Sequence, residues 1–66
     1  MKLSEAQRRY EAIMRLPAGA ARDEMLSDLL DQVKKEFNVP RLQSEEWEQQ
    51  NRATSAMYRK IANSRT

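Results

Sequence analysis

The sequence predicts a small all-α protein: an antiparallel helical hairpin with a third helix, continuous or broken, packed across it. Three observations support this fold class. Apolar residues recur at helical spacing in three successive segments, prolines interrupt the chain between them, and no run of β-branched residues alternates with polar ones as in a strand. The 66 residues allow a single helical domain, 1–66, with a limited core.

The first predicted helix spans about residues 4–16. Ser4, followed three residues later by Gln7, matches a capping box at its start. Pro17 and Gly19 end it, because proline cannot continue a helix comfortably and glycine turns freely. The apolar residues that share one arc of about 100° on this helix are Leu3, Ala6, Tyr10, Ile13 and Met14.

The second predicted helix spans about residues 20–37 and carries the widest apolar arc in the chain, about 140°. We therefore place it at the centre of the fold. Asn38 is a favourable left-handed cap, and Pro40 prevents continuation of the helix. The apolar residues of this arc are Met25, Leu26, Leu29, Leu30, Val33 and Phe37.

An extended connector over residues 38–44 follows, and Val39 and Leu42 are expected to hold it against the core. Ser44 is the predicted N-cap of the third helical region, which spans about residues 45–62. Residues 63–66 are expected to fray.

The third region has two interpretations. As one continuous helix it places four apolar residues on one arc, but three polar residues fall between them on the same arc. A break near Gln50, with Asn51 capping a new helix, removes this conflict, and we favour the break. The apolar residues are Trp47, Met57, Tyr58 and Ile61, and the polar ones are Gln50, Asn51 and Thr54.

Composition argues against catalysis. The chain has no His and no Cys, so it lacks the commonest general base, the strongest neutral nucleophile, disulfides and a Cys/His zinc site. A single glycine cannot form a phosphate-binding or dinucleotide-binding loop. We predict no catalytic, cofactor-binding or metal-ligating residues and no small-molecule substrate. The carboxylates Glu24, Asp28 and Asp31 share a helix face, but without a calcium-loop glycine they are best interpreted as a solubilising face.

Charge is distributed unevenly along the chain. Residues 1–22 carry a net charge of +3, residues 23–48 carry −5 and residues 49–66 carry +4, for a total of +2. The longest run without a polar side chain, 16–21, is too short for a membrane span or a secretory signal. Because the chain also lacks cysteine, we expect a cytoplasmic protein that does not bind membranes.

These observations favour a small regulatory or adaptor protein that binds another protein, or itself as a homodimer, through a helix face. The third region is the first candidate surface, since aromatic residues dominate binding hot spots. Its candidate contact residues are Trp47, Met57, Tyr58 and Ile61. The acidic stripe Glu24, Asp28 and Asp31 is the second candidate, suited to a basic partner.

Two alternatives remain. A nucleic-acid accessory protein would contact phosphates through Arg52, Arg59 and Lys60. Against this, the proline-containing connector is too long for a helix-turn-helix, and the acidic middle repels phosphate. A subunit of a helical homo-oligomer, stable only when packed, is the other alternative. In its overall style, short, charged, helical and without cysteine, the chain resembles accessory proteins of bacteria and their mobile elements, although no family motif is recognised.

Overall fold

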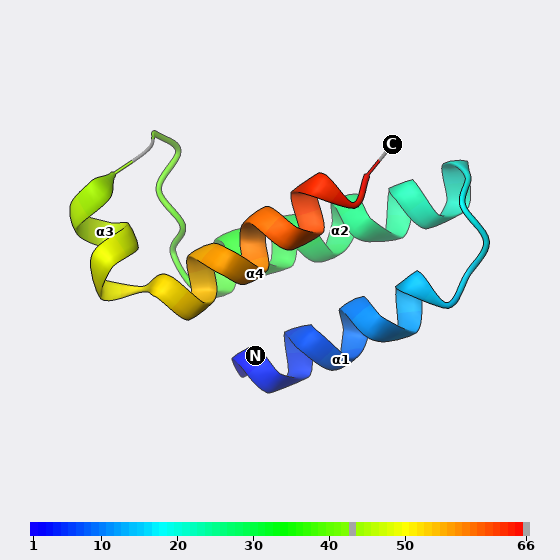
Figure 1. Cartoon of the computed structure of the whole chain (residues 1–66), viewed down its shortest axis with the longest axis horizontal. Helices are drawn as coiled ribbons and strands as arrows, with labels where there is room; N and C mark the ends of the chain where they lie inside the picture. Colours follow the sequence, from blue (N-terminus) through cyan, green and yellow to red (C-terminus); the bar gives the residue numbers. More distant parts are fainter. Residues whose placement is uncertain (43, 66) are drawn as a thin grey trace.

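A computed structural model describes residues 1–42 and 44–65 and shows four α-helices in them. The first two helices form an antiparallel hairpin, the last helix packs across one face of it, and the third helix projects at one end (Figure 1). The helices are α1 (Leu3–Met14), α2 (Ala20–Glu36), α3 (Glu45–Gln50) and α4 (Arg52–Asn63). The predicted fold class is therefore confirmed, with the third helix broken.

The core lies between α1, α2 and α4. Helix α2 supplies four of the eight buried apolar residues, which confirms its central place. No residue of α3 is buried, so the core is closed without that helix. The buried residues are Ala6, Tyr10, Leu26, Leu29, Leu30, Val33, Met57 and Ile61.

The predicted capping box at the start of the first helix is wrong. Helix α1 begins one residue earlier, with Lys2 in the N-cap position and no side-chain cap. The backbone carbonyl of Lys2 accepts hydrogen bonds from the N–H groups of Glu5 and Ala6 at 3.0 and 3.1 Å. The Ser4 side chain is exposed, and the helix ends at Met14, two residues before the predicted end.

The predicted left-handed cap at the end of α2 is confirmed. Asn38 has a φ angle of 54°, the left-handed conformation that asparagine tolerates better than most residues. The N–H of Val39 then reaches back to the carbonyl of Lys34 at 3.0 Å, which completes a Schellman motif and turns the chain away from the helix axis.

The third region is broken at Asn51, which separates α3 from α4. Ser44 caps α3 as predicted, and its hydroxyl accepts a hydrogen bond from the backbone N–H of Trp47 at 3.3 Å. Asn51 occupies the N-cap position of α4 as predicted, but its side chain makes no cap bond to that helix. Its amide instead donates to the carbonyl of Trp47 at 2.9 Å and so closes the end of α3.

The end of the chain does not fray as predicted. Helix α4 continues to Asn63, and the Ser64 hydroxyl lies 2.7 Å from the hydroxyl of Tyr10 in α1. The guanidinium of Arg65 donates to the hydroxyl of Ser27 in α2 at 3.1 Å. These contacts tie the last turn to both helices of the hairpin. Gln43 of the predicted connector and Thr66 of the predicted frayed tail lie outside the described residues.

Candidate functional site

The four apolar residues predicted as one contact surface lie in two different environments. Met57 and Ile61 face the hairpin and are 8% and 0% exposed, so they belong to the core and offer no contact area. Trp47 and Tyr58 are half-buried. The break at Asn51 explains the separate position of Trp47, because α3 and α4 no longer share one helical arc, whereas Tyr58 lies on α4 beside the buried Met57. The prediction that Met57 and Ile61 belong to a contact surface is therefore wrong.

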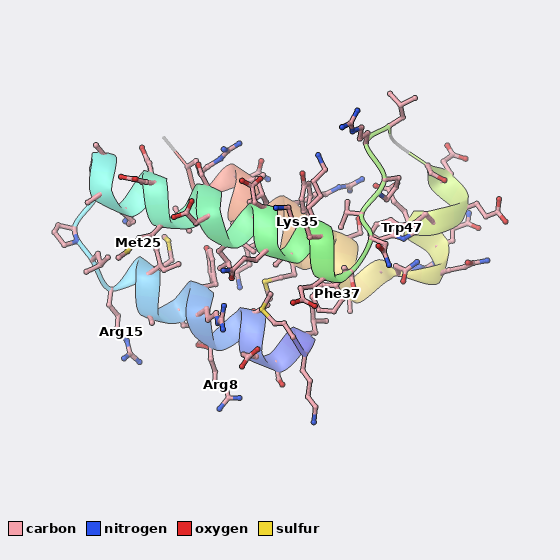
Figure 2. The ribbon with its side chains drawn as sticks, turned by 180° about the vertical axis from the view of Figure 1, so that it is seen from behind. Arg8, Arg15, Met25, Lys35, Phe37 and Trp47 are labelled. Atoms are coloured by element: carbon pink, nitrogen blue, oxygen red, sulfur yellow. The ribbon has the colours of Figure 1, made fainter. Side chains whose placement is uncertain are left out.

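Trp47 and Tyr58 line a depression of about 230 Å³ between the connector, α3 and α4. Figure 2 shows Trp47 at the end of the molecule where the connector and α3 lie side by side. The connector contributes Leu42, which is 83% exposed, the highest value among the large apolar residues described. The apolar residues of this depression are Val39, Pro40, Leu42, Trp47 and Tyr58, and we refer to them as the Trp47 surface.

The predicted role of Leu42 is wrong, and Val39, although half-buried, is not among the apolar residues that pack against the core. Sequence reasoning placed Leu42 against the core because it is apolar. The connector instead passes beside α3 at a distance from the hairpin (Figure 1), so no core surface is within reach.

The charges beside the Trp47 surface are mainly basic. Val39 also lines a neighbouring depression of about 530 Å³, whose charged residues are Lys34, Lys35 and Arg41 with the single carboxylate Asp31. Lys35 and Arg41 are exposed and Lys34 is half-exposed, so their side chains are accessible to a partner. A ligand seated against the apolar residues would meet these cations at one side.

The acidic stripe of α2 is exposed along its whole length, since Glu24, Asp28 and Asp31 are all solvent-accessible. In the part of the chain that the structure describes, no three acidic residues come close enough together to hold a metal ion.

The three cations proposed for nucleic-acid contact do not form one continuous basic face. Arg59 pairs with Glu48 of α3, and Arg52 lines the same depression of about 330 Å³ as Glu48 and Glu45. Lys60 lies elsewhere, with its ammonium group 5.0 Å from the centre of the Tyr10 ring. The break at Asn51 thus brings carboxylates of α3 next to the arginines of α4.

A second apolar surface was not predicted from the sequence. It is a shallow groove of about 330 Å³ between α1 and α2, and we refer to it as the α1–α2 groove. Its apolar residues include Ile13, Leu29 and Met25, and Met25 is 49% exposed. Figure 2 shows Met25 between the two helices, on the face of the hairpin turned away from α4. The arc of about 140° on the second helix was the available signal, because it is wider than packing against a single neighbour requires.

Comparison of the chain with protein-family models, with curated proteins and with solved structures finds no match. No helix among residues 1–42 and 44–65 is long and apolar enough to cross a membrane.

Proposed function

We propose that this chain is a small regulatory or adaptor protein, without catalytic activity, that binds another protein through the Trp47 surface. The observation that carries the proposal is the position of Leu42, 83% exposed at the edge of a depression whose other walls include Trp47 and Tyr58. One exposed leucine is ordinary on a protein surface. The two half-buried aromatic residues beside it, Trp47 and Tyr58, are of the residue types that dominate binding hot spots.

The size of the depression favours a protein side chain over a small molecule. Its volume of about 230 Å³ is below the roughly 300–1,000 Å³ typical of small-molecule pockets. A single apolar side chain of a partner would cover Trp47 and Leu42 without needing a deeper cavity. Burial of that area from water would supply most of the affinity.

The adjacent cations indicate the chemistry of the partner. Lys34, Lys35 and Arg41 outnumber the one carboxylate beside them, Asp31. The Glu48 carboxylate that also lines the Trp47 depression is paired with Arg59. A partner segment with an apolar anchor followed by acidic residues would satisfy both parts of this surface. The acidic residues would set the orientation and speed association, more than they would add to affinity.

The environment of the carboxylate pairs supports a role without catalysis. Asp28 and Asp31 are exposed on α2, and Glu45 and Glu46 are exposed at the start of α3. Acid–base catalysis by two carboxylates needs environments that separate their proton affinities, usually in a cleft. These four carboxylates all face water and are not enclosed in such a cleft.

A comparative capture experiment tests the proposal. The full chain and its Leu42→Glu variant are immobilised, and proteins retained from a lysate of the native host are identified by mass spectrometry. We expect at least one protein that the parent retains about tenfold more strongly than the variant, since a charge would be placed against the apolar anchor. Because Leu42 is so exposed, the variant should unfold at the same temperature as the parent.

The matched control is Leu16→Glu, a change at another exposed leucine, outside the Trp47 surface. It should retain the same protein as fully as the parent does. An Arg41→Glu variant should retain it less well, with the difference shrinking at high salt. Equal retention by the parent and by Leu42→Glu would contradict the proposal.

A further inference from the structure

We propose that two copies of this chain pair through the α1–α2 groove, with α1 of each copy lying over α2 of the other. The proposal concerns a surface that shares no residue with the Trp47 surface, so it does not depend on the function proposed above.

The groove lies on a face of the hairpin that no other helix covers. Helix α4 packs on the opposite face, as the two views in Figure 1 and Figure 2 show. Met25 is 49% exposed there, next to the half-buried Ile13 and the buried Leu29. Covering this apolar area would be favourable, and nothing in the hairpin itself covers it.

The charges at the groove indicate which occupant fits. Within the described residues, the groove is lined by one cation from α1, Arg9, and one anion from α2, Asp28. The Arg9 guanidinium donates to the Gln32 side chain of α2 in the same hairpin at 2.7 Å, and its remaining N–H groups can pair with a partner. At the end of the hairpin near Met1, a neighbouring depression is lined by Glu5 and Arg9 on α1 and by Lys35 and Glu36 on α2. Glu36 is already paired there with the Met1 amino group at 3.3 Å, which leaves Glu5 and Lys35 as a second pair of opposite charges. At two positions along the hairpin, a charge on α1 therefore lies near an opposite charge on α2: Arg9 near Asp28, and Glu5 near Lys35.

This pattern is self-complementary about a two-fold axis along the groove. Such an axis lays α1 over α2 of the partner and keeps each residue at its own level along the hairpin. Arg9 then meets the partner's Asp28, and Glu5 meets the partner's Lys35, each pair occurring twice. The alternative axis, across the helices, lays α2 on α2 and brings the two acidic stripes together, which is unfavourable.

The dimensions allow a dimer but not a tight one. The molecule measures 36 × 22 × 16 Å, and the hairpin face is seen along the shortest of these directions (Figure 2). The hairpin occupies only part of this face, because α3 projects beyond it (Figure 1), so we expect the interface to be smaller than the roughly 800 Å² per copy of a standard one. Because only the centre of the face is apolar, we expect a weak dimer with a dissociation constant of about 10–500 µM.

Sedimentation velocity of the full chain tests the pairing. We expect the mean mass to rise from monomer towards dimer as the concentration is raised to about 1 mM, well above the dissociation constant expected above. Met25→Glu should weaken the dimer at least tenfold, because it places a carboxylate in the apolar centre. The control is Leu42→Glu, a change at another exposed apolar residue, which lies outside the groove and should leave the dimer intact. A parent chain that stays monomeric, or a dimer that only the control disrupts, would overturn the proposal.

A charge exchange identifies the helix pairing. In Arg9→Asp and in Asp28→Arg, like charges meet twice across the axis, so each variant alone should dimerise at least tenfold more weakly than the parent. An equimolar mixture of the two variants restores both attractive pairs, so it should form a heterodimer. The double variant with both changes in one chain should also dimerise.

Circular dichroism verifies that each exchanged chain is folded, which is expected because both side chains are exposed. Two folded variants that remain monomeric in the mixture would show that α1 does not lie over α2 of the partner. Charge pairing within one hairpin cannot produce a heterodimer. Formation of the heterodimer would therefore show that Arg9 and Asp28 pair between copies and not only within one copy.

Discussion

The hydroxyl groups of Tyr10 and Ser64 lie 2.7 Å apart and join the first helix to the residue that follows the last one. The Ser64 hydroxyl also donates to the backbone carbonyl of Lys60 at 2.8 Å. A carbonyl can only accept, so the single proton of Ser64 is committed to Lys60. Tyr10 is therefore the donor to Ser64, and its hydroxyl fixes the position of the end of α4.

Removal of this hydroxyl should lower stability modestly. We expect Tyr10→Phe to reduce the free energy of unfolding by about 0.5–1.5 kcal/mol, the usual net contribution of one hydrogen bond. For a chain of this length, each 1 kcal/mol corresponds to a fall in melting temperature of roughly 4–8 °C. Thermal unfolding followed by circular dichroism measures this fall in melting temperature.

The control for this change is Tyr58→Phe, because the Tyr58 hydroxyl has no hydrogen bond to any residue that the structure describes. It should change the melting temperature by less than Tyr10→Phe does. Equal effects of the two variants would mean that the contact between Tyr10 and Ser64 does not stabilise the fold.

The core is small, so the loss of one buried side chain should remove much of the free energy of unfolding. Ile61 is fully buried between α4 and the hairpin, and deletion of its side chain in Ile61→Ala should cost about 2–5 kcal/mol. A core of this size supplies roughly 3–5 kcal/mol in total, so much of this variant should be unfolded at 25 °C. Ile61→Val should cost only about 0.5–1.5 kcal/mol and stay folded. Urea unfolding distinguishes them, and a fully folded Ile61→Ala chain would contradict the assigned core.

Asn38 permits a test of the left-handed turn after α2. Its φ angle of 54° suits glycine at least as well as asparagine and suits a β-branched residue poorly. We expect Asn38→Gly to be as stable as the parent within about 0.5 kcal/mol, and Asn38→Val to lose about 1–2 kcal/mol. The difference between these two melting temperatures is the measurement, and a Val variant as stable as the Gly variant would exclude the left-handed conformation.

Loss of the cap on α3 should destabilise that helix without destabilising the rest of the fold. Ser44→Ala removes the bond to the Trp47 N–H and should destabilise α3 by about 0.5–2 kcal/mol. Because α3 buries no residue, the global unfolding transition should barely move. Hydrogen exchange should accelerate at the amides of residues 47–50 and remain slow in α2.

Ser4→Ala is the matched control for this experiment, since Ser4 is exposed and does not cap α1. It should leave hydrogen exchange in α1 unchanged. Faster exchange in α2 after Ser44→Ala would mean that α3 is coupled to the core.

The features that the sequence predicted well depend on local patterns. The central place of α2 follows from its wide apolar arc, and the break at Asn51 follows from the polar residues that interrupt the arc of the third region. The left-handed turn at Asn38 and the cap at Ser44 are each determined within a few residues. The exposed positions of the acidic stripe also follow from helical spacing.

The failed predictions concern contacts between distant parts of the chain. Tyr10 and Ser64 are 54 residues apart, so no local pattern could show that the predicted frayed end is held in place. The exposure of Leu42 depends on the path of the connector in space, and that of Met25 depends on which face α4 covers. Of the candidate site, Trp47 and Tyr58 were identified, whereas Leu42 and the groove required the fold.

Because no residue of α3 is buried, the part of the proposed contact surface that α3 carries lies outside the core that stabilises the fold. Substitutions at the exposed positions of residues 41–42 and 44–50 do not reach the core between α1, α2 and α4, so natural variants could diverge there without unfolding the chain. The same segment is a favourable place for a randomised library, in which new specificities are selected on an unchanged scaffold.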